Sequence, residues 1–213
     1  MEQTEIQILD QDDAPKLLSA AKSTRLHVPV ILALTTGMRR GEVLAIRWQD
    51  IDLDGAVLTV IQSLEQTKAG LRFKPPKSKK SRRRISLSPL TVDALRRHKV
   101  KQLEERLALG LGKNDSGLVF TTVEGEPVNP RKFSKDFYWI VKRSKIKRVT
   151  FHGLRHTHIT QLLKDGEHIK VVSERVGHSS IAITLGVYGH VIPGMDEDTA
   201  LRVDAAWGNA LQE

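Results

Sequence analysis

Cysteine is absent from the 213 residues, which excludes disulfide bonds and any zinc site built on thiolates. Long apolar runs are lacking as well. The longest, at residues 28–34, contains Pro29 and is far too short to cross a bilayer. The N-terminal sequence does not show the basic and apolar regions of a signal peptide. We therefore expect a soluble, cytoplasmic chain that has no membrane partner.

Acidic residues are outnumbered by basic ones. The chain has 34 Lys and Arg against 25 Asp and Glu, a formal net charge of +9 and a pI near 9.9. Such a charge favours an anionic partner, and nucleic acid is the first candidate. A basic but otherwise ordinary protein is the alternative. The length suits one large domain, which we place at residues 1–213, with residues 1–10 as an extended lead-in.

Hydrophobic periodicity predicts a mainly helical fold. Helices are expected near residues 12–22, 27–35, 40–46, 88–109, 130–145, 154–163, 168–176 and 196–211. Within 88–109, one apolar face is expected to carry Val92, Leu95, Leu103 and Leu107. Three β runs at 57–61, 70–74 and 84–87 predict a small three-stranded antiparallel sheet. The predicted fold class is therefore α+β.

Several polar residues lie at the ends of these predicted elements. Arg39 stands at the joint between two helices, where packing on both sides would fix a long side chain. His152, Arg155, His178 and Tyr188 lie together in the C-terminal third. These side chains suit the cutting of a phosphodiester without a metal. Guanidinium groups grip phosphate oxygens, positive charge favours the phenolate of a Tyr, and an imidazole can take a proton.

The motifs also occur in a recognisable order. Residues 36–42 (TGMRRGE) are followed by a Lys in a predicted hairpin, then by His152-x-x-Arg155, Gly177-His178 and Tyr188. In this order and spacing the sequence resembles the phage-integrase or tyrosine-recombinase family, over about residues 10–194. The resemblance implies a tyrosine-recombinase catalytic-domain-like fold and a site-specific recombinase or integrase acting on double-stranded DNA. It also implies a 3′-phosphotyrosine intermediate, with no cofactor, metal or ATP.

A role for each position follows from the same resemblance. Two arginines would clamp the scissile phosphate, with a histidine donating to it. A lysine would be the general acid on the 5′ oxygen, a second histidine the general base, and a tyrosine the nucleophile. The positions that would fill these roles are, in that order, Arg39 and Arg155, His178, Lys77, His152 and Tyr188.

The basic run in the predicted hairpin tip has more than one interpretation. Lys77 is the expected acid, although Lys79 and Lys80 lie beside it. We expect Lys79, Lys80, Arg82 and Arg83 to contact DNA phosphates. A solvated hairpin tip or a localisation signal is the alternative.

Other residues near the motifs have plainer interpretations. Arg40 is the alternative to its neighbour for the first clamp position. His152 and His156 have the spacing of a metal pair, but no third ligand lies at a suitable spacing, so no metal site is predicted. His156 and His158 are interpreted as structural residues, and Tyr138 as a packing residue on its helix.

Full recombinases of this family usually carry an N-terminal core-binding domain, which we expect to be absent. DNA binding should then be weak, largely non-specific and strongly salt-dependent. Residues 196–213 carry an apolar stripe that is expected to dock on a further protomer on DNA, or alternatively on its own domain. We expect a bacterial or phage-encoded protein. A type IB topoisomerase-like enzyme and a catalytically silent DNA-binding fragment are the alternative functions.

Overall fold

The structure is a computed structural model that describes residues 7–75, 81–111, 116–189, 200 and 203–205. Its helices are α1 (Ala14–Ala21), α2 (His27–Thr36), α3 (Arg40–Val43), α4 (Pro89–Ala108), α5 (Pro130–Arg143), α6 (Phe151–Lys164), α7 (Ile169–Val176) and α8 (Ile181–Tyr188). Its strands are β1 (Ile51–Asp52), β2 (Val57–Val60), β3 (Ser63–Thr67), β4 (Gly70–Lys74) and β5 (Arg83–Ser86). Short 3-10 turns, η1 (Gln11–Asp13) and η2 (Trp48–Asp50), complete the elements. The predicted mainly helical fold with a small antiparallel sheet is confirmed.

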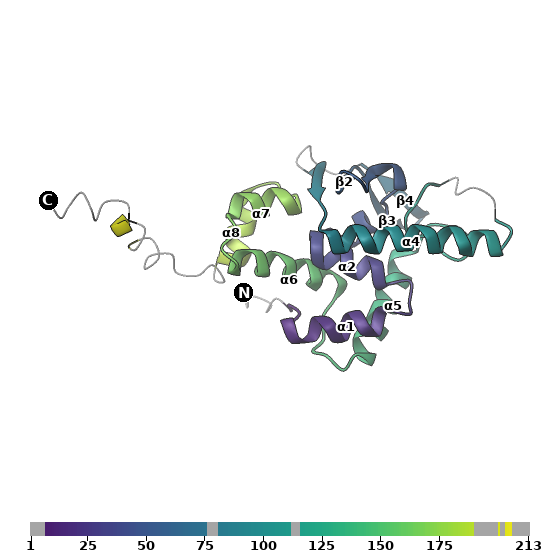
Figure 1. The fold of residues 1–213 in the computed structure, drawn as a ribbon, viewed down its shortest axis with the longest axis horizontal. Coiled ribbons are helices and arrows are strands. Elements are labelled where there is room, and N and C mark those ends of the chain that lie inside the picture. The colour runs from purple at the N-terminus through teal and green to yellow at the C-terminus, as the bar shows by residue number, and fades with distance from the viewer. Residues whose placement is uncertain (1–6, 76–80, 112–115, 190–199, 201–202, 206–213) are drawn as a thin grey trace.

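Helix α2 lies at the centre of the domain, with α4 and α6 packed against it (Figure 1). Its sequence is almost wholly apolar, and Val30, Leu32 and Ala33 are buried, as is typical of a helix enclosed on all sides. The helix ends at Gly37, whose φ of 64° is a left-handed conformation that suits glycine. The chain then turns into α3, and this turn sets the position of Arg39.

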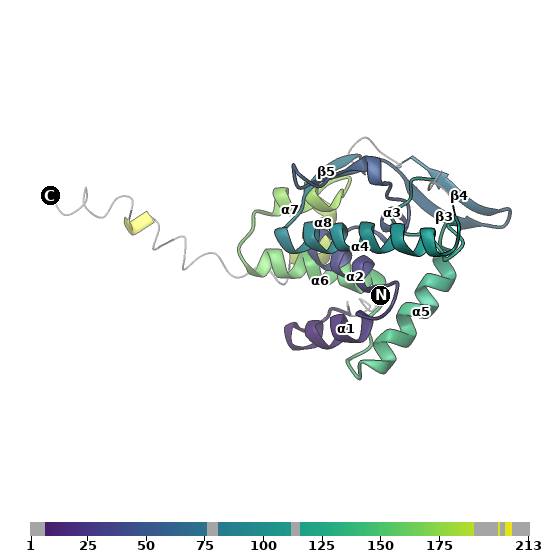
Figure 2. The ribbon, with the colours of Figure 1, turned by 45° about the vertical axis from the view of Figure 1, so that its right-hand side comes forward.

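The strands form two antiparallel sheets rather than the single sheet predicted. β1, β2 and β5 make a three-stranded sheet in the order β1-β2-β5, in which Leu58 pairs with Ile85. β4 pairs with β3 instead, and Figure 2 shows this hairpin extending away from β5. The predicted pairing of residues 70–74 with 84–87 is therefore wrong. β3 directly precedes β4, so a short turn pairs them at low entropic cost.

Helix α4 departs from its predicted apolar face in its second half. Leu103 is 54% and Leu107 is 78% exposed, because this half of α4 extends past the rest of the domain (Figure 1). The buried residue there is polar. Gln102 accepts a hydrogen bond from the Trp48 indole over 2.8 Å and donates to the Val119 carbonyl over 3.0 Å. A satisfied amide thus takes the place expected for leucines.

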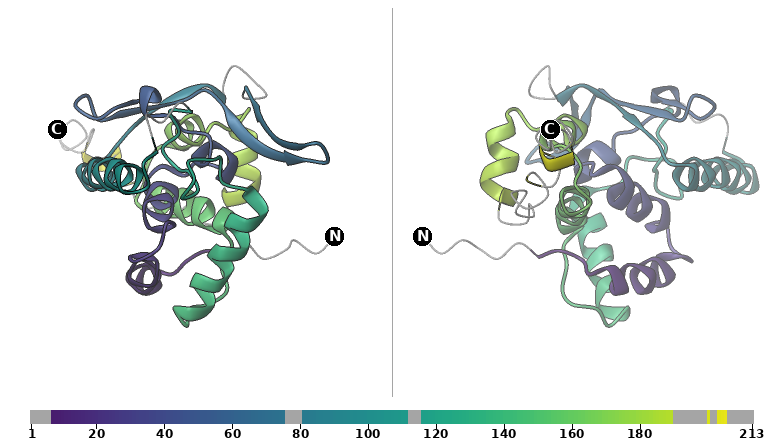
Figure 3. Two further views of the ribbon diagram at one scale, coloured as in Figure 1. Left: turned by 90° about the vertical axis from the view of Figure 1, so that its right-hand side faces the viewer. Right: turned by 60° about the vertical axis from the view of Figure 1, so that its left-hand side comes forward.

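Helices α6, α7 and α8 lie together at one end of the domain (Figure 3). α6 and α7 match predicted helices, whereas α8 was not expected. A small apolar cluster joins the three helices and consists of Ile159, Leu163, Val172, Val176 and Tyr188. Because Tyr188 is only 2% exposed, this cluster anchors the C-terminal end of α8.

The predicted C-terminal helix at 196–211 lies mostly outside the described residues. Ala200 and residues 203–205 are helical and exposed. Across the described ranges, no helix is both long and apolar enough to cross a membrane.

Candidate active site

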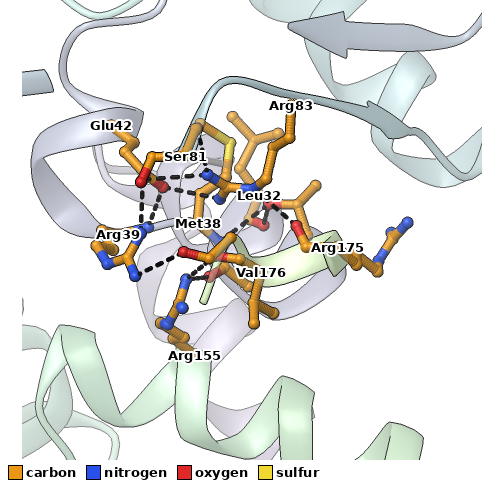
Figure 4. A network of polar contacts seen from close by, with 12 residues as sticks. Leu32, Met38, Arg39, Glu42, Ser81, Arg83, Arg155, Arg175 and Val176 are labelled. Atoms are coloured by element: carbon orange, nitrogen blue, oxygen red, sulfur yellow. Dashed lines mark hydrogen bonds and ion pairs between the residues drawn. The ribbon is translucent and has the colours of Figure 1, made fainter. Parts of the chain in front are cut away.

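The C-terminal end of α7 accepts hydrogen bonds from three arginines on three other parts of the chain (Figure 4). Arg83 Nε, Arg155 Nη1 and Arg39 Nη2 donate to the carbonyl oxygens of residues 175, 176 and 177 over 2.7, 2.9 and 3.2 Å, respectively. The last carbonyls of a helix lack partners within it and carry the negative end of the helix dipole. They therefore attract cationic side chains, and the end of α7 brings the three arginines together.

Arg39 is positioned by the turn before α3. Its backbone N–H donates to Glu42 Oε2 over 2.9 Å, and its Nη1 donates to Glu42 Oε1 over 3.0 Å. The side chain remains 39% exposed. One face of this guanidinium is thus fixed by protein, and the other is open to a ligand.

Arg155 is the most enclosed of the three arginines, at 2% exposure. Its Nη1 donates to the Gly37 carbonyl over 2.7 Å as well as to the end of α7. Its Nη2 is buried and finds no hydrogen-bond partner among the described residues. Burial, followed by the charge of Arg39, lowers the pKa of Arg155 to about 9, so it stays cationic at neutral pH. A phosphate oxygen would supply the partner that this buried donor lacks.

Two neutral imidazoles lie beside the arginines. His178 follows α7, and its Nδ1 lies 2.8 Å from Thr184 Oγ1 on α8, which fixes the ring and leaves Nε2 for a ligand. Burial, then Arg155 and Arg39, lowers the pKa of His178 to about 4. His152 keeps an exposed surface, yet partial burial, then His156, then the nearby arginines lower its pKa to about 4 as well. Both rings are therefore neutral at pH 7 and can donate or accept.

The hydroxyl of Tyr188, at the end of α8, contacts His156, a residue whose sequence context had suggested only a structural role. His156 Nδ1 lies 2.5 Å from the Tyr188 oxygen. Burial raises the pKa of Tyr188 to about 12, against the opposing effect of Arg155. The available signal was the four-residue spacing from His152, which puts both imidazoles on one face of α6. Their rings meet edge to face at 4.8 Å.

A cavity of about 630 Å³ opens next to this cluster, between the β3–β4 hairpin and α5. Its lining includes the cationic side chains of Arg39, Arg40, Lys74 and Arg148, together with His152 and Tyr138. Tyr138 is 45% exposed, and its ring packs edge to face on that of Trp139, with centroids 5.4 Å apart. Within the described ranges, no group of three or more His, Asp or Glu residues could hold a metal ion. Glu65 also lines the cavity and pairs with Lys74, so cationic side chains outnumber the acidic one beside the arginine cluster.

The phage integrase family matches residues 7–194 of this sequence. The chain belongs to the phage integrase family. A tyrosine recombinase XerC-like protein of Caldanaerobacter subterraneus subsp. tengcongensis is 34% identical over 90% of this chain and 52% of that protein. The chain spans about half the length of the curated relatives it matches.

Solved structures share this phage integrase fold. The Tn1549 transposon integrase in complex with transposon right end DNA superposes with a TM-score of 0.80 at 22% identity, covering 96% of this chain and 68% of that one. The catalytic domain of bacteriophage HP1 integrase gives a TM-score of 0.61 at 21% identity, covering 93% of this chain and 95% of that one. At these identities the likeness establishes the fold of a phage integrase catalytic domain.

The remaining residues expected at the site from the phage integrase motifs differ in where they lie. Lys77, Lys79 and Lys80 lie outside the described residues. Arg82 is exposed, as a DNA contact requires. Arg40 is exposed and turns its Nη1 to Ser134 on α5, 2.5 Å away. It therefore lines the cavity without joining the arginines at the end of α7.

Arg83 lies differently from the expected DNA contact. Its side chain is only 6% exposed, and its Nη2 lies 2.9 Å from Glu42 Oε2. The alternation of β5 accounts for this, because Arg83 and Ile85 face inward while Arg84 and Ser86 face outward. The guanidinium therefore belongs to the framework behind Arg39.

Proposed function

We propose that this chain is the catalytic domain of a site-specific DNA recombinase or integrase, which cleaves and rejoins strands through a 3′-phosphotyrosine. The observation that carries the proposal is the meeting of Arg39 and Arg155 at adjacent carbonyls of α7, with one Arg155 donor buried and unpaired. Cationic donors fixed before the substrate arrives stabilise charge that develops in the transition state. A phosphodiester is the substrate that suits this clamp.

In the proposed reaction the Tyr188 oxygen attacks the scissile phosphorus and the bond to the 5′ oxygen breaks. Arg39, Arg155 and His178 would bind the non-bridging oxygens as negative charge grows on them. Lys77 would protonate the departing 5′ oxygen, as the family resemblance implies. A 5′ hydroxyl from another strand could then attack the phosphotyrosine and reseal the DNA, so that neither ATP nor a metal ion is consumed.

The resemblance gives the general base as His152. A second imidazole, that of His156, has its Nδ1 2.5 Å from the oxygen of Tyr188, the proposed nucleophile. These two residues are the candidates for accepting the phenolic proton.

Double-stranded DNA is the proposed partner. The net charge of +9, the basic cavity beside the clamp and the exposed Arg82 support it, and the related Tn1549 transposon integrase is seen in complex with DNA. We propose further contacts from Lys79 and Lys80, and docking on neighbouring protomers through residues 196–213. A DNA substrate of a bacterium or phage would place the reaction in the cytoplasm.

The alternatives differ in what they do to a strand. The relatives reported above are recombinases and integrases, which does not favour a type IB topoisomerase. A catalytically silent DNA-binding fragment would bind duplexes and leave them intact. The test must therefore detect a covalent bond rather than binding.

A pool of nicked random-sequence duplexes, labelled at the 5′ end of the strand to be cut, supplies that test. After cleavage the short fragment downstream diffuses away, and the labelled strand stays on the protein. We expect a denaturation-resistant adduct from the wild type and none from Tyr188→Phe, with the adduct mapped to Tyr188 by mass spectrometry. Tyr138→Phe, at the other tyrosine, is the matched control and should form adduct. Binding without any adduct would identify a silent module.

A further inference from the structure

His156 is the imidazole that contacts the reacting atom of Tyr188. Its Nδ1 lies 2.5 Å from the phenolic oxygen, and the two ring centroids lie 5.7 Å apart. The residues belong to α6 and α8, which both pack on α7, and Tyr188 is buried in the small apolar cluster at this end of the domain. The contact is therefore set by helix packing rather than by a mobile surface side chain.

His152 has no such contact with the phenol among the described residues. Its ring meets that of His156 edge to face, with centroids 4.8 Å apart. His156 thus contacts both His152 and Tyr188. A proton leaving Tyr188 would reach His156 first.

The charge states of the pair suit proton transfer. The ionisable groups that face His156 are His152 and Arg155 on α6, Tyr188 on α8, and His178 after α7. Burial, followed by the charge of Arg155, lowers the pKa of His156, so the ring is neutral at pH 7 and able to accept a proton. Burial raises the pKa of Tyr188 to about 12, so the phenol keeps its proton until the reaction removes it.

We propose that His156 is the general base of the cleavage step, in place of His152; this inference rests on the proposed function. As the Tyr188 oxygen bonds to the scissile phosphorus, its proton passes to His156 Nδ1. The bond between phosphorus and the 5′ oxygen breaks, and that oxygen takes its proton from the general acid. In the rejoining step the proton returns from Nδ1 to the departing phenolic oxygen, so the base is restored with each cycle.

Two substitutions separate proton transfer from positioning. His156→Ala removes the ring, whereas His156→Asn can still hydrogen bond from about the position of Nδ1 but cannot take up a proton. Since general base catalysis contributes roughly 10²–10⁴-fold, both variants should lose single-turnover cleavage of the nicked duplex by at least about 100-fold. Added imidazole should restore part of the rate of His156→Ala. The control is His168→Asn, the same change at the exposed N-cap of α7, where asparagine is a favoured capping residue.

A duplex with sulfur in place of the 5′ bridging oxygen identifies which proton is involved. A thiolate leaves without protonation, so this substrate should rescue a variant that lacks the general acid. It should not rescue His156→Asn, because the phenol must still lose its proton. Thermal unfolding of each variant, followed by circular dichroism, shows whether a lost rate reflects a lost fold.

Three results would overturn the inference. One is cleavage by folded His156→Asn within about tenfold of wild type, which would mean that the residue only positions Tyr188. Another is rescue of His156→Asn by the sulfur substrate, which would make His156 part of the acid. The third is a loss of cleavage in His152→Asn that His156→Asn does not share. A wild-type chain that forms no adduct at all would overturn the proposed function as well.

Discussion

Arg83 and Glu42 form an ion pair that is almost completely enclosed. Arg83 Nη2 lies 2.9 Å from Glu42 Oε2, and the two side chains are 6% and 5% exposed (Figure 4). Glu42 also accepts hydrogen bonds from Arg39, so one carboxylate connects the buried Arg83 to the partly exposed Arg39. Burial alone would raise the pKa of Glu42, but the two arginines outweigh it and leave the pKa below its ordinary value.

Replacing Arg83 should damage the fold and the clamp rather than DNA binding. Arg83→Met leaves Glu42 buried without its main partner, and breaking such a pair typically costs about 3–5 kcal/mol. We expect that loss in urea unfolding at pH 7. Cleavage should also fall, because Glu42 would no longer fix Arg39.

The salt dependence of duplex binding shows whether Arg83 contacts phosphate. A lost phosphate contact lowers the slope of log K against log salt by about one. Arg83→Met should leave this slope unchanged, whereas the matched variant Arg82→Met, at an exposed position, should lower it with little effect on stability. A reduced slope for Arg83→Met would restore the DNA contact expected from the sequence.

Gly177 lies in the turn at the end of α7, where the three arginines meet. Its replacement should lower both the stability of the fold and the rate of cleavage. Its φ is 70°, and an added Cβ would lie 2.8 Å from Arg83 Nη1. Gly177→Ala should therefore lose about 1–2 kcal/mol to backbone strain and displace Arg83, with a fall in single-turnover cleavage. Gly166→Ala is the matched control, since its φ is 80° but nothing lies within 4 Å of the added Cβ. The hypothesis fails if the two variants cleave equally well.

The helices and the points where they end could largely be predicted from the sequence. The pairing of the strands, which depends on residues elsewhere in the chain, could not. Helix α2 and its stop at Gly37 follow from an apolar run and one glycine. The partner of β4 depended on a polar strand, SLEQT, whose one large apolar residue is Leu64. Its strand character comes from pairing with β4, which leaves little trace in its own residues. Leu103 and Leu107 continue a helical stripe that the core is too short to cover.

The candidate site shows the same division. The motifs identified Arg39, Arg155 and Tyr188 as a set. His156 contacts Tyr188, which lies 32 residues further along the chain, and no helical or strand periodicity predicts a contact at that separation. Alternation along β5 could have placed Arg83 inside and Arg82 outside, had it been applied to the basic run. A charged residue can be buried where a buried partner is available to it, and for Arg83 that partner is Glu42 from α3. The basic run by itself does not reveal this partner.

The free energy of unfolding should decrease as the pH falls, because His158 is buried in its neutral form. This histidine is 7% exposed, its Nδ1 bonds to the Leu34 carbonyl over 2.8 Å, and burial followed by Arg175 lowers its pKa from 6.5 to about 4. Between these values the unfolded chain binds more protons than the folded one, so its contribution is complete above pH 6.5 and is lost as the pH falls to 4. The loss from this residue is about 3 kcal/mol. Urea unfolding should show a flatter pH profile for His158→Gln than for wild type; identical profiles would contradict this assignment.

Arg155→Lys should separate binding of the duplex from its cleavage. An ammonium group can replace the hydrogen bonds to Gly37 and Val176, but it cannot also present the planar second nitrogen that lies buried and unpaired in this structure. Loss of one fixed donor to the developing charge costs about 3–4 kcal/mol of barrier, so single-turnover cleavage should fall by roughly 10²–10³-fold. The affinity for the duplex should change little, because it comes from contacts with many phosphates, of which Arg155 makes only one. Arg143→Lys, at an arginine on the surface of α5 that donates to the Ala20 carbonyl, should match wild type in both measurements. A parallel fall in affinity and cleavage for Arg155→Lys would mean that Arg155 binds the ground state as strongly as the transition state, and the clamp would not be catalytic.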